Sequence, residues 1–79
     1  MPPAPAPFRE QLRAMRVAVA SFRAAKNGDR PAVPLVLVQR PVYRAFGIDT
    51  EEAMGRWPPE HRALMSRIQA AIRRLAGWA

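Results

Sequence analysis

The chain of 79 residues contains no cysteine, a single histidine and no long apolar run. Without cysteine the protein forms no disulfide and offers no thiolate ligand to a metal. A membrane-crossing helix needs about 20 consecutive apolar residues, so we do not expect a membrane-spanning protein. The N-terminus lacks the apolar core of a secretory signal peptide, so we do not expect secretion.

Residues that carry catalytic chemistry are equally scarce. His61 has no cysteine or carboxylate at metal-ligand spacing, and Ser21 and Ser66 do not occur in a nucleophile motif. Glu51 and Glu52 are adjacent, so on a helix they point apart. The four glycines form no phosphate-binding loop. We therefore predict no enzyme, no catalytic residues, no cofactor and no metal site.

Acidic residues are few, and basic residues are many. Thirteen Lys and Arg stand against six Asp and Glu, which gives a net charge of +7, and twelve of the thirteen are arginine. The stretch 49–60 holds four of the acids, whereas residues 61–79 hold four arginines and no acid. Arginine presents a planar fork of donors that fits carboxylates and phosphates. The composition therefore predicts an acidic partner.

Two segments have the apolar periodicity of long amphipathic helices. The first spans residues 8–26 and ends at Asn27-Gly28, a common helix stop. Its apolar stripe comprises Phe8, Leu12, Met15, Val19 and Phe22. The second spans residues 59–76 and follows Pro58. Its apolar face comprises Leu64, Met65, Ile68, Ala71, Ile72 and Leu75.

The middle of the chain is predicted to be extended. Residues 35–38 read Leu-Val-Leu-Val after Pro34, which favours an extended apolar segment over about residues 33–39. No second strand is evident, so this segment must pair with a partner's sheet edge or a second copy, or lie against helices. Pro41 is expected to start a short helix over residues 41–46. Asp49 and Glu52 resemble a capping box, which predicts the start of a second short helix over residues 50–56.

The predicted fold class is therefore mainly α. A proline-rich N-terminal arm, residues 1–7, precedes a single small helical domain, residues 8–79. So small a chain buries few large apolar side chains, so we do not expect a stable isolated monomer.

The candidate site residues are all partner-binding residues. The apolar candidates are Leu35, Val36, Leu37, Val38 and the two tryptophans, Trp57 and Trp78. The charged candidates are Arg13, Arg16, Arg67, Arg73 and Arg74. At the level of sequence these arginines fit a solvated face, an acidic protein surface, anionic lipid head groups or the phosphates of nucleic acid.

One stretch resembles a known family. Tyr43, Phe46-Gly47-Ile48, Asp49, the stretch from Glu52 to Pro58 and then Arg67-Ile68-Gln69-Ala70-Ala71-Ile72 form the pattern. It resembles the small, non-catalytic, matrix-side helical subunit of mitochondrial ubiquinol–cytochrome c reductase over about 30 residues. The interval between Gly47 and Pro58 is shorter than in that family, and residues 8–38 do not match it. The resemblance implies a structural role without a redox cofactor, on the matrix side of the inner membrane.

The leading functional hypothesis is a non-catalytic accessory subunit or adaptor that docks on a larger protein assembly, such as a respiratory complex. The alternative is a small, dimeric, basic regulator that binds nucleic acid. A third is a small protein inhibitor that blocks a nucleic-acid-binding site. The expected compartment is the mitochondrial matrix side of the inner membrane and otherwise the cytoplasm.

Overall fold

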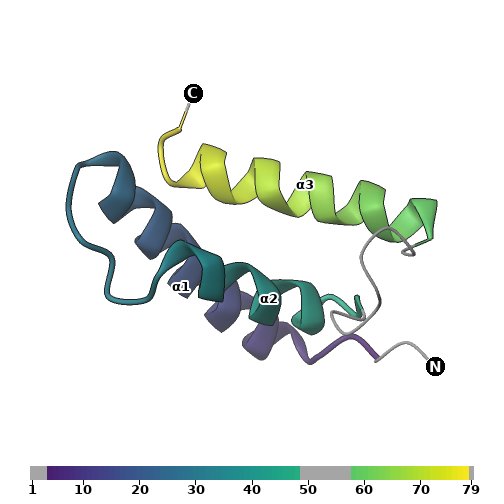
Figure 1. Ribbon diagram of the computed structural model, residues 1–79. Coiled ribbons are helices and arrows are strands. Elements are labelled where there is room, and N and C mark those ends of the chain that lie inside the picture. The colour runs from purple at the N-terminus through teal and green to yellow at the C-terminus, as the bar shows by residue number, and fades with distance from the viewer. Residues whose placement is uncertain (1–3, 49–57, 79) are drawn as a thin grey trace.

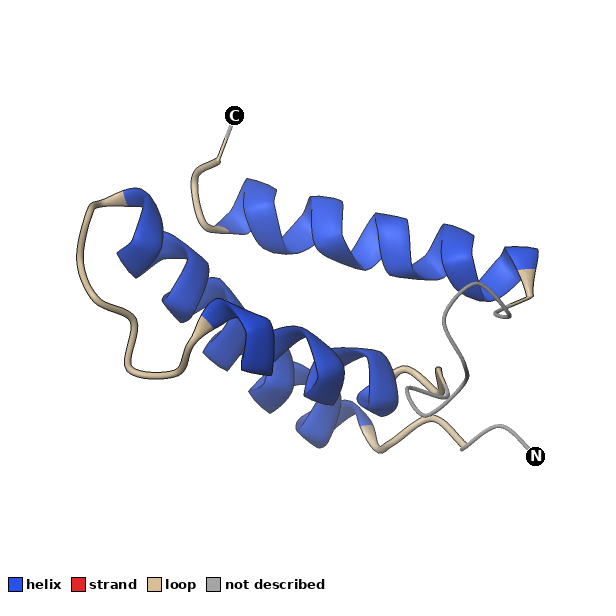
Figure 2. Cartoon of the chain, viewed as in Figure 1, coloured by secondary structure: helices blue, strands red, loops and turns tan. Residues whose placement is uncertain are grey.

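The computed structural model describes residues 4–48 and 58–78, which form three α-helices and no strand. Figure 1 shows α1 and α2 side by side, joined at one end by the loop of residues 27–34, with α3 lying across one side of the pair. Figure 2 shows a loop joining α1 to α2, and the described residues outside the three helices are loops or turns. The predicted mainly α fold is therefore confirmed. The predicted short helix over residues 50–56 lies outside the described residues.

Helix α1 spans Phe8–Lys26, as predicted, but its buried face is not the predicted stripe. Phe22 is buried, whereas Phe8 is 74% exposed and Leu12 is 36% exposed. The most buried position is Ala18, which lies roughly 80° around the helix axis from the centre of the stripe, at about 100° per residue. Small residues let helix backbones approach closely, so α1 packs through its alanine-bearing side, and part of the stripe remains in solvent.

Helix α2 spans Leu35–Ala45 and overturns two predictions for the middle of the chain. The prediction of an extended apolar segment over residues 33–39 is wrong, because α2 begins at Leu35. The short helix over residues 41–46 is wrong as well, because Pro41 lies inside a helix that began six residues earlier. The described residues contain no strand, so the prediction that residues 35–38 could pair as a strand is also wrong.

Packing explains why α2 runs through the proline. Val38 and Val42 are almost completely buried, and Leu35 packs against the same core. Together with buried Ala45, these residues recur at spacings of 3, 4 and 3, which is one helical stripe. Burying this stripe outweighs both the strand preference of the apolar run and the local break expected at Pro41.

Helix α3 spans Pro59–Leu75, so it ends one residue before the predicted boundary. Ile68 and Ile72 are buried, as expected from the apolar face, whereas Leu75 is 57% exposed. Gly77 follows with a φ of 90°, a conformation that suits glycine at a helix end. No helix among the described residues is both long and apolar enough to cross a membrane.

The core lies where the three helices meet. Buried side chains from all three helices and from the segments after α2 and α3 form one cluster: Ala18, Phe22, Val38, Val42, Tyr43, Ile48, Ile68, Ile72 and Ala76. One polar contact crosses it, because the Gln69 side-chain amide donates a 2.7 Å hydrogen bond to the Tyr43 hydroxyl. Burial raises the pKa of Tyr43, although the Gln69 hydrogen bond and nearby Arg73 act in the opposite direction.

Both ends of the described chain are attached to the helices. The Trp78 indole N–H donates a 2.8 Å hydrogen bond to the Phe22 carbonyl, and the two rings lie edge to face with centroids 5.8 Å apart. The Arg23 guanidinium donates to the Leu75 carbonyl at 2.9 Å. Near the N-terminus, the Ala6 N–H donates to the Ala45 carbonyl at 2.8 Å, which joins the arm before α1 to the end of α2.

Candidate functional site

The most extensive candidate site is a groove of about 540 Å³ between α1 and α2. Its lining comes from the N-terminal arm, both helices and the loop between them: Ala6, Glu10, Arg13, Ala14, Val17, Val33, Leu37, Val38, Pro41, Arg44 and Ala45. Eight of these eleven residues are aliphatic or proline, so the groove, which we call the α1–α2 groove, is chiefly an apolar surface.

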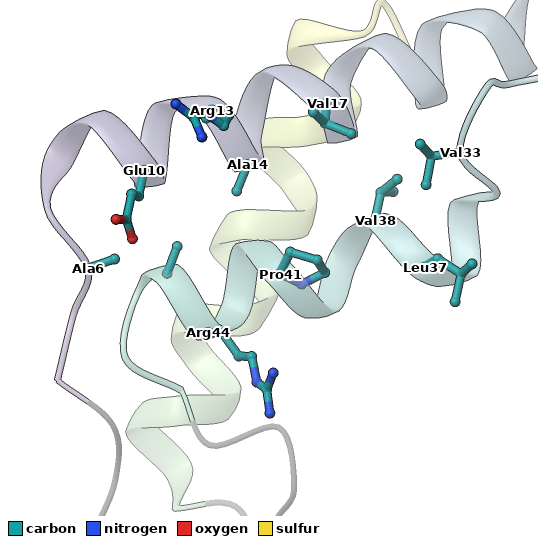
Figure 3. A pocket seen from close by; sticks show the side chains of 11 residues that line it. Ala6, Glu10, Arg13, Ala14, Val17, Val33, Leu37, Val38, Pro41 and Arg44 are labelled. Atoms are coloured by element: carbon teal, nitrogen blue, oxygen red, sulfur yellow. The ribbon is translucent and has the colours of Figure 1, made fainter.

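The charged side chains lie at the margins of the α1–α2 groove. Figure 3 shows Val17, Val33 and Val38 close together at one end, with Glu10 near the opposite end. Arg13 lies on the α1 side, and Arg44 points away from α1 on the α2 side. An apolar floor between basic margins suits a ligand that has apolar and acidic groups together.

A second hollow, of about 460 Å³, continues the same surface around α2. It shares Leu37, Pro41 and Arg44 with the α1–α2 groove and adds Val36 and Arg40. Val36 is 82% exposed and Leu37 is 60% exposed, so this edge of α2 presents aliphatic side chains to solvent. The two hollows together form one apolar surface that follows α2 and carries arginines beside it.

Pro41 belongs to both hollows and is unfavourable for its own helix. Proline has no N–H, so the Leu37 carbonyl lacks the donor that residue 41 would otherwise supply. A carbonyl in a helix points toward the residue four positions on, so this oxygen lies on the same face as the Leu37 and Pro41 side chains. Local rules are most often broken at functional sites, which draws attention to this face.

The structure separates the predicted apolar site residues. Val36 and Leu37 are exposed on the surface just described, whereas Val38 is buried in the core and Leu35 is half-buried against it. Trp78 packs on Phe22 and is 37% exposed. Trp57 lies outside the described residues.

The predicted arginines are also separated. Only Arg13 lines the α1–α2 groove. Arg16 lines a smaller hollow of about 310 Å³ between α1 and Leu75 of α3. Arg67, Arg73 and Arg74 are exposed on α3 and line neither of the hollows beside α2. These arginines therefore do not form one site.

Sequence reasoning missed Val17, Val33, Arg40 and Pro41 as components of the site. For Arg40 and Pro41 there was a signal, the spacing of Leu35, Val38, Val42 and Ala45, which marks α2 as one helix. No pattern in the sequence points to Val17 or Val33. Once α2 is a helix, Leu37 and Pro41 share a face four residues apart.

The described residues also contain no group of three or more His, Cys, Asp or Glu placed to hold a metal ion. His61 lies in the first turn of α3, and its buried Nδ1 has no hydrogen-bond partner in that part of the chain. A single imidazole nitrogen does not by itself make a recognisable catalytic arrangement.

Comparisons with protein-family models, curated proteins and solved structures give no match to this chain. The resemblance to the reductase subunit therefore remains a prediction from the sequence.

Proposed function

We propose that this chain is a non-catalytic accessory subunit or adaptor that docks on a larger protein assembly through the α1–α2 groove. The observation that supports this proposal is the groove of about 540 Å³, mostly aliphatic, in a chain of net charge +7. Removing apolar surface from water is favourable by about 25 cal/mol per Å², so a partner that covers this surface stabilises the complex. Contiguous exposed apolar patches are typical of binding sites.

A narrower form of the proposal places the assembly on the matrix side of the mitochondrial inner membrane. Its support is the resemblance of residues 43–72 to the reductase subunit. In the broader form the assembly is cytoplasmic, and the chain docks on it through the same groove. The proteins that co-purify with the chain distinguish the two forms.

The test is native purification of the tagged chain from its own cells, with and without nuclease, followed by sizing and mass spectrometry. We expect the wild-type chain to travel in a large, nuclease-resistant assembly. Leu37→Asp should release it, because a carboxylate placed against an apolar partner surface is strongly unfavourable. Leu75→Asp is the control, since Leu75 has similar exposure, 57% against 60%, but lies outside the groove. Retention of Leu37→Asp in the assembly would contradict docking through this groove.

A second candidate function is nucleic-acid binding, which the charge distribution favours. The described residues carry twelve Lys and Arg against three acids, Glu10, Asp29 and Glu60. Arg67, Arg73 and Arg74 are exposed on α3, away from the surface beside α2. Phosphate contacts of this kind release counterions, so the affinity should fall steeply as the salt concentration rises.

Titration of a labelled duplex and a labelled single strand over a range of salt concentrations tests this second candidate. Binding that weakens with salt, and that is lost when Arg67, Arg73 and Arg74 are changed together to glutamine, would support it. Affinity that does not depend on salt would eliminate it.

A further inference from the structure

We infer that the occupant of the α1–α2 groove is an acidic amphipathic helix of about three turns, supplied by the partner protein. This inference rests on the proposed function and names the chemistry that its groove selects. Four observations carry it: the architecture around the groove, the length of α2, the charges beside it and the backbone at Pro41.

The architecture favours a helix over other peptide conformations. Strand addition needs an exposed sheet edge, and the described residues contain no strand. Recognition of a polyproline segment uses aromatic-lined grooves, whereas none of the eleven residues lining this groove is aromatic. An aliphatic groove between two packed helices is the setting in which a third amphipathic helix binds.

The length of α2 sets the length of the occupant. Eleven residues at about 1.5 Å per residue give a helix about 16 Å long. A partner helix lying along it makes about three turns of contact. Its apolar residues should recur at i, i+3, i+4 and i+7, so that they face Val17, Val33 and Leu37.

The charges select an acidic helix. Arg13 lies beside the groove on α1, and Arg40 and Arg44 lie along the continuing surface of α2. Glu10 is the one acidic residue of the lining within the described part of the chain. Among the described residues of the two hollows, arginines outnumber glutamate, so carboxylates that flank the apolar stripe of the partner are attracted.

The position of Pro41 in α2 is further support for binding at the face of α2 that lines the groove. The Leu37 carbonyl lacks the donor that residue 41 would otherwise supply, and Leu37 and Pro41 both line the groove. Proline at this position is unfavourable for the helix, and departures from local rules are expected at functional sites.

The first test uses a synthetic peptide as the probe. It is about 14 residues long, roughly 21 Å as a helix, with leucine at i, i+3, i+4 and i+7, glutamate on both flanks and blocked ends. Amide chemical shifts of the wild-type chain report where the peptide binds, and anisotropy of a labelled peptide reports its affinity. We expect shifts concentrated along α1 and α2 at the groove.

Matched variants test the apolar contact. Leu37→Ser should weaken peptide binding by about tenfold or more, because it removes an exposed aliphatic contact at the groove. Leu75→Ser, at a leucine of similar exposure outside the groove, should leave the affinity unchanged. Val17→Ser, on the α1 side of the groove, tests the same apolar contact independently if Leu37→Ser disturbs α2. Equal effects at Leu37 and Leu75 would overturn the inference.

A second matched pair tests the charge. Arg13→Glu and Arg16→Glu make the same change in net charge three residues apart on α1, but only Arg13 lines the groove. Arg13→Glu should weaken the glutamate peptide more than Arg16→Glu does, and it should strengthen the same peptide with lysine in place of glutamate. If the wild-type chain prefers the lysine peptide, the inference is wrong.

The remaining outcomes separate this inference from the proposed function. Shifts confined to α3 would place acidic ligands on its arginines and overturn the inference. Concentration-dependent self-association that Leu37→Ser abolishes would assign the groove to a second copy of the chain and also overturn it. If Leu37→Asp releases the chain from its native assembly but the peptide does not bind the groove, the proposed function stands and the acidic helix is the wrong occupant.

Discussion

Replacing Pro41 with alanine should make the protein more stable. Pro41 is the seventh residue of α2, beyond the first turn in which a helix tolerates proline. Alanine restores an N–H that can donate to the Leu37 carbonyl and removes the clash of the pyrrolidine ring with that carbonyl. Proline in a helix interior is less favourable than alanine by about 3 kcal/mol.

Part of this gain is offset by lost packing. The proline ring lines the α1–α2 groove but is exposed, so its loss removes only part of the roughly 0.8 kcal/mol per methylene that full burial provides. A net stabilisation of about 2 kcal/mol remains. In a domain of this size about 1 kcal/mol moves the midpoint of thermal unfolding by roughly 4–8 °C, so the expected rise is roughly 8–16 °C.

Thermal and urea unfolding followed by far-ultraviolet circular dichroism measure the change. Pro59→Ala is the matched control, because Pro59 occupies the first position of α3, where proline fits the helix. We expect that variant to be unchanged or slightly less stable. A Pro41→Ala midpoint equal to or below that of the wild type would refute the reasoning. If the variant is more stable and also binds the acidic peptide more weakly, the proline is retained for binding at the expense of stability.

Two further predictions concern the contacts that hold the helices together. Trp78→Ala should lower the free energy of unfolding by about 2–3 kcal/mol in urea, because it removes the ring contact and hydrogen bond to Phe22, whereas Leu75→Ala should lower it by less than about 1 kcal/mol. Equal losses would show that Trp78 contributes no more than an exposed residue. Tyr43→Phe should lower the free energy of unfolding by about 1 kcal/mol near neutral pH, because the Gln69 amide loses its acceptor.

The pH dependence of Tyr43 gives that variant a second readout. Burial raises the pKa of Tyr43 above its ordinary value of 10.0, so folding favours the neutral phenol. This contribution is fully present below pH 10.0 and is lost as the pH rises through the pKa of the folded state. The stability of the wild type should therefore fall toward that of Tyr43→Phe in alkaline solution. Parallel stability curves for the two proteins above pH 10.0 would contradict the assignment.

The fold class, the two long helices and the net charge could all be predicted from local patterns and composition. The apolar periodicity over residues 8–26 and 59–76 and the helix ends near Gly28 and Gly77 are local features, so they can be read without knowing what the helices pack against. The excess of arginine is likewise a property of composition. These features predicted a mainly α chain, and the structure confirms it.

The conformation of residues 35–45, and with it the site, depends instead on packing between the helices. Residues 35–38 favour a strand locally, and Pro41 favours a break, yet packing of Val38 and Val42 in the core makes one helix of both. The same packing turned α1 toward its alanines and left Phe8 and Leu12 exposed. The α1–α2 groove arises from that arrangement, because it joins residues of both helices and the loop between them. Burial depends on what every segment faces, so no local pattern could show that Val17, Val33 and Pro41 share a surface.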